Sequence, residues 1–235
     1  MTPEGPMTAK QYDNHKKYKI HLIAKMNTLN HYKPFADLFR YPDDKFSSQA
    51  NSFLSTVSAT FPAQAEKLSV FIGSIEGLTV KQQQEYFMKT FDVQAICYLD
   101  IGYVMFGEDY KRAQLLVNLQ NEHKTAGVDC GTELADHLPN VLSLLASSNN
   151  REFTEELGFI ILTPAVRFML TKFNNTDNHY KGLLEVLLSI LQHDFPGEGL
   201  AAFAFADESF SETNEFLMPS PKMDICNSNC KQKRH

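Results

Sequence analysis

Tryptophan is absent from this 235-residue sequence, and signals for β-structure are scarce. No Asn-Gly or Asp-Gly pair joins two runs of alternating polar and apolar residues, as a hairpin would require. Long apolar runs are missing too. The most apolar stretch, 158–170, is interrupted by Pro164 and Arg167, and a membrane span needs roughly 18 apolar residues. These absences argue against a β-fold and against stable membrane insertion.

Recognisable catalytic motifs are also missing. The sequence contains no Gly-x-Gly-x-x-Gly, no phosphate-binding loop, no Gly-x-Ser-x-Gly and no His-Glu-x-x-His. Its eight histidines are scattered, and none stands four residues from a carboxylate in a way that suggests a metal site on a helix. We therefore expect a binding or scaffold protein without a cofactor or metal of its own, and no enzymatic activity.

The charge balance points away from nucleic acid. The formal net charge is −6, whereas proteins that bind phosphate backbones or anionic membranes usually present basic surfaces. The N-terminal residues show no basic region followed by an apolar one, so no secretory signal is predicted. We expect a cytoplasmic protein.

The four cysteines are then expected to be thiols rather than disulfides. Cys97 lies in an apolar stretch and is expected to be buried. Cys226 and Cys230 could form a redox pair or bind a metal, but the tail around them offers no second pair of ligands.

Helical periodicity fills most of the chain. The predicted fold class is all-α, a single-domain bundle of roughly eight to ten helices over residues 14–195. Residues 1–13 are expected to be a flexible leader and 196–235 a flexible tail. The apolar spacing predicts helices over 15–30, 34–40, 44–59, 62–75, 79–91, 93–106, 109–126, 137–146, 151–174 and 177–194.

Several boundaries carry specific signals. Thr79 and Gln82 have the spacing of a capping box, and Gly127 suits the residue after a helix. The 93–106 stretch is apolar almost all round, apart from Asp100, and predicts a central helix in which Gly102 allows close packing. Asp136 is predicted to cap the next helix, with Pro139 in its first turn. Residues 151–174 predict either one helix kinked at Thr163-Pro164, or two helices with Thr163 as the cap of the second.

Two clusters draw attention beyond the fold. The first is Gly102-Tyr-Val-Met-Phe-Gly-Glu-Asp-Tyr-Lys-Arg112, and the second is Glu133-Leu-Ala-Asp-His-Leu-Pro139. Each alone could be an ordinary helix boundary. Together with Leu38-Phe-Arg-Tyr-Pro-Asp43, they resemble the redox-enzyme maturation chaperones, in particular the nitrate-reductase delta-subunit or NarJ-type branch, which is related to the TorD/DmsD chaperones. The family's second motif usually has Pro where this chain has Ala135.

The resemblance implies a chaperone for a molybdenum oxidoreductase. Such proteins bind the N-terminal segment of the enzyme's catalytic subunit and hold the apoenzyme while the molybdenum cofactor is inserted. The implied partner is that catalytic subunit, with molybdenum-cofactor biosynthesis proteins as further candidates and with no nucleic acid. The sequence leaves the oligomeric state open between monomer and dimer. The expected function is assembly of a nitrate-reductase-type complex.

The candidate peptide-binding residues come from the two clusters. Apolar pockets are expected from Tyr103, Phe106 and Leu138, and carboxylates for a basic peptide from Glu133 and Asp136. The complete set is Tyr103, Phe106, Arg112, Glu133, Asp136, His137, Leu138 and Pro139.

Three alternatives stay open. In the first, Asp136 serves only as a helix cap, so that its loss affects stability and not binding. In the second, the client is an exported enzyme with a twin-arginine leader. In the third, the chain is a small α-helical metal-dependent enzyme that uses His137 with Asp100 or Glu133.

Overall fold

The computed structural model describes residues 29–174 and 176–197 and is all-helical over these ranges, with no β-strand in them. The predicted fold class is confirmed. The helices enclose one continuous hydrophobic core, in which phenylalanines such as Phe35, Phe53, Phe71 and Phe153 are almost fully buried. Much of the phenylalanine content is thus explained as core packing. The predicted leader, residues 15–28 of the helix expected over 15–30 and most of the predicted tail lie outside the described residues, and Leu29–His31 form a short 3-10 helix, η1.

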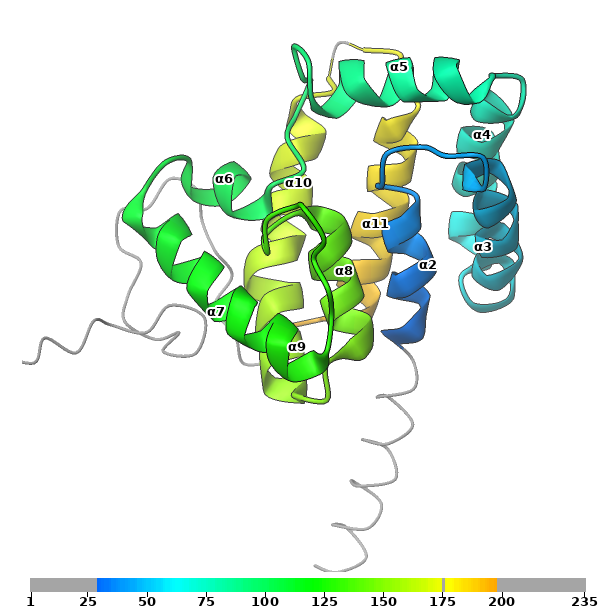
Figure 1. Ribbon diagram of the computed structural model, residues 1–235. Helices are drawn as coiled ribbons and strands as arrows, with labels where there is room; N and C mark the ends of the chain where they lie inside the picture. Colours follow the sequence, from blue (N-terminus) through cyan, green and yellow to red (C-terminus); the bar gives the residue numbers. More distant parts are fainter. Residues whose placement is uncertain (1–28, 175, 198–235) are drawn as a thin grey trace, which may run out of the picture.

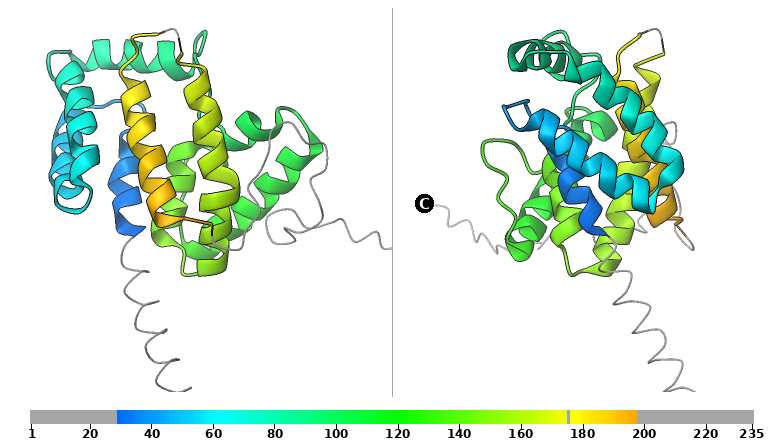
Figure 2. Two further views of the ribbon diagram at one scale, coloured as in Figure 1. Left: turned by 180° about the vertical axis from the view of Figure 1, so that it is seen from behind. Right: turned by 90° about the vertical axis from the view of Figure 1, so that its right-hand side faces the viewer.

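The bundle is arranged around α8. This helix (Leu138–Ser147) packs against α2 (Tyr32–Asp37), and α10 (Thr163–Thr171) packs against α11 (Tyr180–Asp194). Figure 2 shows the last two running side by side. Helices α3 (Phe46–Thr60) and α4 (Pro62–Glu76) pair at one edge, where α4 contacts α11. In Figure 1, α6 (Ile101–Phe106) and α7 (Tyr110–Ala126) form the opposite edge, and α5 (Val80–Phe91) crosses the top.

Local sequence signals explain several helix ends. Thr79 accepts a hydrogen bond from the backbone N–H of Gln82 at 3.3 Å, while the Gln82 side chain accepts one from the Thr79 N–H at 2.9 Å. The predicted capping box is therefore formed at the start of α5. Asp109 accepts from the Lys111 N–H at 2.8 Å and begins α7. Gly127 follows α7 with a left-handed φ of 67°, which glycine adopts without strain.

The helix predicted over 93–106 is largely wrong. Helix α5 ends at Phe91, and α6 begins only at Ile101. The backbone between them bonds to other segments instead: Ile101 N–H donates to the Asp136 carbonyl, and the Leu99 carbonyl accepts from the Leu138 N–H, both at 2.8 Å. These tertiary hydrogen bonds replace helical ones. Apolar composition alone could not reveal this, because a buried irregular segment is as apolar as a buried helix.

The stretch predicted over 151–174 is one continuous helical run with a wider segment inside it. Helix α9 (Arg151–Glu156) leads into the π-helix η2 (Leu157–Leu162), which leads into α10. Thr163 Oγ donates to the Gly158 carbonyl at 2.8 Å, five residues earlier, and the following Pro164 has no N–H to donate. The wider π-helix thus occurs where the backbone lacks the N–H donor of Pro164 and where the Thr163 side chain bonds to a backbone carbonyl. Thr163 does not cap a separate helix.

Candidate functional site

A polar cleft of about 520 Å³ lies beside α5, where three distant parts of the chain meet. One wall comes from residues just after α2, another from the end of α5 and the 92–100 segment, and a third from the turn before α8. The lining residues are Arg40, Tyr41, Phe87, Phe91, Asp92, Tyr98, Leu99, Asp100, Glu133, His137 and Pro139.

The turn before α8 is held against the 92–100 segment by backbone pairing. Asp100 and His137 pair in antiparallel fashion, with the Ile101–Asp136 and Leu138–Leu99 hydrogen bonds on either side. Asn140 adds side-chain hydrogen bonds to the carbonyls of Cys130 and Leu134, at 3.2 and 3.0 Å. The cleft walls are therefore joined by hydrogen bonds, and the 133–139 turn has a defined position.

A buried ion pair lies beneath this turn. Asp136 is fully buried, and its Oδ2 accepts from Arg112 Nε at 3.0 Å. Burial raises the pKa of the Asp136 carboxyl, against the opposing effect of Arg112. Gly102 makes room for the pair: a Cβ at this position would stand 2.7 Å from Asp136 Oδ2. The close contact predicted at Gly102 is thereby explained.

A second acidic group reaches the cleft surface. His137 Nδ1 forms a hydrogen bond with Asp100 Oδ1 at 3.1 Å, and Arg112 approaches Asp100 Oδ2 at 3.8 Å. The hydrogen bond from His137 lowers the pKa of the Asp100 carboxyl, although partial burial acts the other way. Asp100 thus has a partner at each of its carboxylate oxygens. The other ring nitrogen of His137, Nε2, is left for a further hydrogen-bond partner.

The predicted site residues divide into three groups. Glu133, His137 and Pro139 line the cleft. Arg112, Asp136 and Leu138 form its support, since Asp136 and Leu138 have no exposed surface and Arg112 bonds to the buried carboxylate. Tyr103 lines a neighbouring pocket, and Phe106 is half-buried against the core.

Two expectations for Asp136 are therefore wrong. It does not cap α8, because His137 occupies the N-cap position and no side chain caps that helix. It also cannot pair directly with a peptide cation, because its carboxylate is enclosed beside Arg112 and Gly102. Leu138, expected to form an apolar pocket for the peptide, is likewise part of the core. Pro139 does lie in the first turn of α8, as predicted.

Sequence reasoning missed most of the cleft lining, including Tyr41, Asp92 and Tyr98. Asp92 is an exposed carboxylate directly after α5, and Tyr41 and Tyr98 expose 53% and 47% of their surfaces. Tyr41 belongs to the Tyr-Pro motif already noted, which was one available signal. Tyr98 could not be recognised, because the predicted helix over 93–106 placed it wrongly. Asp92 falls between the helices predicted over 79–91 and 93–106, where no signal marked it as a binding residue.

Charge and exposed apolar surface gather at this cleft. Asp92 and Glu133 form no ion pair with any described residue, whereas Arg40 lies 3.5 Å from Asp37. Of the seven large hydrophobic residues exposed in the described ranges, four lie in the cleft-lining segments: Tyr41, Val93, Tyr98 and Leu134. The arrangement can accept a cationic group between carboxylates and aromatic rings. Exposed apolar groups of this kind often mark protein-binding surfaces.

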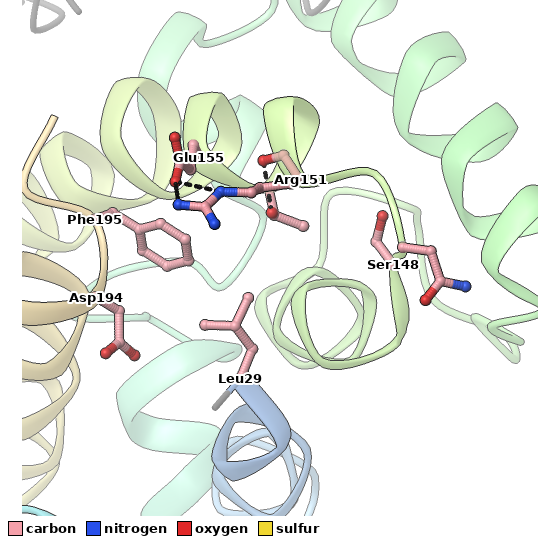
Figure 3. Close-up of a pocket in the computed structure, with 8 residues that line it drawn as sticks. Leu29, Ser148, Arg151, Glu155, Asp194 and Phe195 are labelled. Atoms are coloured by element: carbon pink, nitrogen blue, oxygen red, sulfur yellow. Dashed lines mark hydrogen bonds and ion pairs between the residues drawn. The ribbon is translucent and has the colours of Figure 1, made fainter. Parts of the chain in front are cut away.

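Two other hollows are present. Figure 3 shows one in which Leu29, Asp194 and Phe195 converge near the ion pair between Arg151 and Glu155. Its volume of about 30 Å³ suits little more than a water molecule. The other, an apolar pocket of about 310 Å³, adjoins the polar cleft at Tyr98.

No group of three or more His, Cys, Asp or Glu residues within 29–174 and 176–197 is placed to hold a metal ion. In the same ranges, no helix combines the length and apolar character needed to cross a bilayer. Cys97 is a buried free thiol, as predicted, although it lies outside any helix. Cys226 and Cys230 lie outside the described residues.

Comparison with known proteins gives no assignment: no family model matches this chain, and no curated protein matches its sequence.

Proposed function

We propose that this chain is a cytoplasmic chaperone that binds the N-terminal segment of a molybdenum oxidoreductase's catalytic subunit and performs no catalysis itself. It assists cofactor insertion and assembly of a nitrate-reductase-type complex. The bound segment enters the polar cleft, where Asp92 and Glu133 accept its basic side chains and the exposed faces of Tyr41 and Tyr98 contact its apolar ones.

One observation carries this proposal. Two of the three stretches on which the family resemblance rests are far apart in sequence but line the same cleft, and one residue of the remaining stretch lies beneath it. Arg40 and Tyr41 come from the first stretch, and Glu133, His137 and Pro139 from the third. Arg112, from the second, supports the third through Asp136. This convergence of residues from the first and third stretches supports a shared binding role for them.

The charges at the cleft support a basic ligand. Asp136 is enclosed against Arg112, and Asp100 is engaged by the same guanidinium and by a hydrogen bond with His137, so neither carboxylate is as open to a further cation as Asp92 or Glu133. Asp92 and Glu133 lack such neighbours among the described residues and remain available. Exposed ion pairs contribute about 0.2–1 kcal/mol each. Loss of both carboxylates should therefore weaken binding of a basic segment about 2- to 30-fold.

The test uses the full chain and synthetic peptides covering the N-terminal segments of molybdenum catalytic subunits from the same organism. Calorimetry should detect one or more binding peptides, with weaker binding to the Asp92→Asn/Glu133→Gln variant. Glu66→Gln, an exposed site on α4 away from the cleft, is the matched control and should bind normally. Equal binding of a scrambled peptide, or unchanged affinity in the double variant, would count against the proposal.

An exported client is a second candidate, favoured by the two available carboxylates, since a twin-arginine leader presents two adjacent guanidinium groups. Peptides with and without a twin-arginine motif distinguish these clients. Tight binding only of twin-arginine leaders would assign the chain to the proofreading chaperones of exported reductases. Binding of segments without that motif would favour a client that stays in the cytoplasm.

A further inference from the structure

The apolar pocket beside the polar cleft is built from three elements. Ala95, Ile96 and Cys97 come from the 92–100 segment, Val104 from α6, and Phe168 and Met169 from α10. Its volume is about 310 Å³. An apolar cavity of roughly 150 Å³ can already accept benzene, so this pocket has room for a leucine or phenylalanine side chain.

Tyr98 joins this pocket to the polar cleft, because its side chain lines both. The ring is exposed over 47% of its surface and meets Tyr103 edge to face, with 5.3 Å between ring centroids. Tyr103 in turn lies beneath the Arg112 guanidinium, 5.4 Å from its ring centroid. The Tyr98 ring thus packs on Tyr103, and Tyr103 packs on the arginine that forms the ion pair with Asp136.

We infer that this pocket receives a bulky apolar side chain of the same partner segment whose basic residue enters the polar cleft, with the Tyr98 ring between the two. The inference rests on the proposed function and specifies its ligand. The partner segment carries a cation and an aliphatic or aromatic residue close together. Tyr98 is a wall shared by the pocket and the cleft, and the carboxylates of Asp92 and Glu133 lie in that cleft. These features favour a ligand with both a cation and an apolar group over a purely apolar one.

Lys172 adds selectivity at the pocket rim. Its ammonium group lies 4.5 Å from the centroid of the Phe168 ring, and like charges repel each other. A basic residue is therefore disfavoured in the apolar pocket and favoured in the polar cleft, where Asp92 and Glu133 lie. The apolar pocket thus selects the apolar residue of the partner segment, and the polar cleft selects its basic residue. This difference sets the direction in which the segment binds.

The spacing of the pair depends on the peptide conformation. In an extended chain, side chains two residues apart lie on the same face and are separated by about 7 Å. Side chains three or four residues apart on a helix are separated by about 5–6 Å at Cβ. Either spacing could place two side chains on opposite sides of a tyrosine ring. Adjacent residues point to opposite faces of an extended chain and could not do so.

A first experiment tests the pocket without any peptide. Toluene is titrated into the full chain with labelled methyl groups, and we expect the Val104 and Met169 signals to shift in a saturable way. Ala95→Phe fills the pocket and should abolish the shifts. Ala59→Phe, which makes the same change at an exposed site on α3, should leave them intact. Shifts that persist in Ala95→Phe, or none in the native chain, would overturn the inference.

A second experiment uses short peptides in a Gly-Ser-Ala background that contain Arg alone, Leu alone, or both at the two spacings. We expect the peptide with both residues to bind about 10- to 100-fold more tightly than the Arg-only peptide. Ala95→Phe should remove that gain while leaving Arg-only binding unchanged. Asp92→Asn/Glu133→Gln should weaken both peptides.

The outcomes separate the two proposals. If the carboxylate variant weakens binding but Ala95→Phe does not, the polar cleft stands as a binding site and the apolar pocket is not its partner. If Ala95→Phe weakens binding and the carboxylate variant does not, the coupling of the two hollows is refuted. If the basic, mixed and client peptides all fail to bind, both the proposed function and this inference fail.

Discussion

Arg112 Nε and Asp136 Oδ2 are 3.0 Å apart beneath the turn that opens the polar cleft. The aspartate is completely buried, and its other oxygen, Oδ1, has no hydrogen-bond partner among the described residues. A buried carboxylate with a single charged partner depends strongly on that partner. The pair therefore links the two sequence clusters physically and makes the cleft sensitive to changes outside its surface.

Replacing Arg112 by Met should destabilise the protein by about 3–5 kcal/mol, because an uncompensated carboxylate would remain in the interior. Adding Asp136→Asn should restore part of the loss, since the remaining group is then neutral. Urea denaturation of the two single variants and the double variant measures this coupling. Arg167→Met, at an exposed site on α10, is the control and should change stability little. Strictly additive effects of the two substitutions would refute a direct interaction.

Gly102→Ala should destabilise the protein by about 1–3 kcal/mol. The added methyl would stand 2.7 Å from Asp136 Oδ2 and 3.1 Å from Arg112 Cγ, so the ion pair would have to move. Gly73→Ala in α4 is a matched control, because no atom outside its own helix lies within 4 Å of the added Cβ. That substitution should stabilise the helix by about 0.5–1 kcal/mol. Thermal or urea unfolding of both variants gives the comparison, and equal effects would contradict the packing assigned to Gly102.

Acid should weaken the junction between the start of α2 and the end of α11. Asp194 forms hydrogen bonds with His31 at 2.8 Å and His193 at 2.9 Å. Burial alone would raise the pKa of the Asp194 carboxyl, but these hydrogen bonds bring it below its ordinary value.

An aspartate with a depressed folded-state pKa stabilises the fold above its unfolded-state pKa of about 3.9 and loses that contribution as the pH falls. We therefore expect stability to drop below about pH 4 and to drop less steeply in Asp194→Asn. Urea denaturation across this range measures both slopes. The exposed Asp177→Asn should retain the native slope, and identical slopes in Asp194→Asn would exclude this linkage.

Cys97 should resist alkylation in the folded protein. Its side chain is buried, and burial raises the pKa of its thiol to about 12, so little thiolate exists at neutral pH. Iodoacetamide labelling followed by peptide mass spectrometry should show slow reaction of Cys97, because a reagent that enters the apolar pocket beside it meets little thiolate. The half-buried Cys130 should react sooner. Rapid labelling of Cys97 under native conditions would contradict the packing beside the apolar pocket.

The helices themselves were largely predictable because their signals are local. The capping box at Thr79 and Gln82, the start of α7 at Asp109 and the glycine after it at 127 depend on residues within one turn of each other. Core positions followed from the helical spacing of apolar residues. The same reasoning failed for 93–100, where hydrogen bonds to the 136–138 backbone replace those of a helix.

The amino-acid sequence by itself determined that this is an all-α protein, where most helices begin and end, and that the 133–139 turn is unusual. Only the tertiary structure decided that Asp136 is an interior partner of Arg112, and that Asp92 and Tyr98 join Glu133 and His137 at one cleft. The physical reason is the distance along the sequence between the residues that interact. Helix formation depends on residues three or four positions apart, whereas burial and charge pairing depend on segments that meet only when the chain is folded.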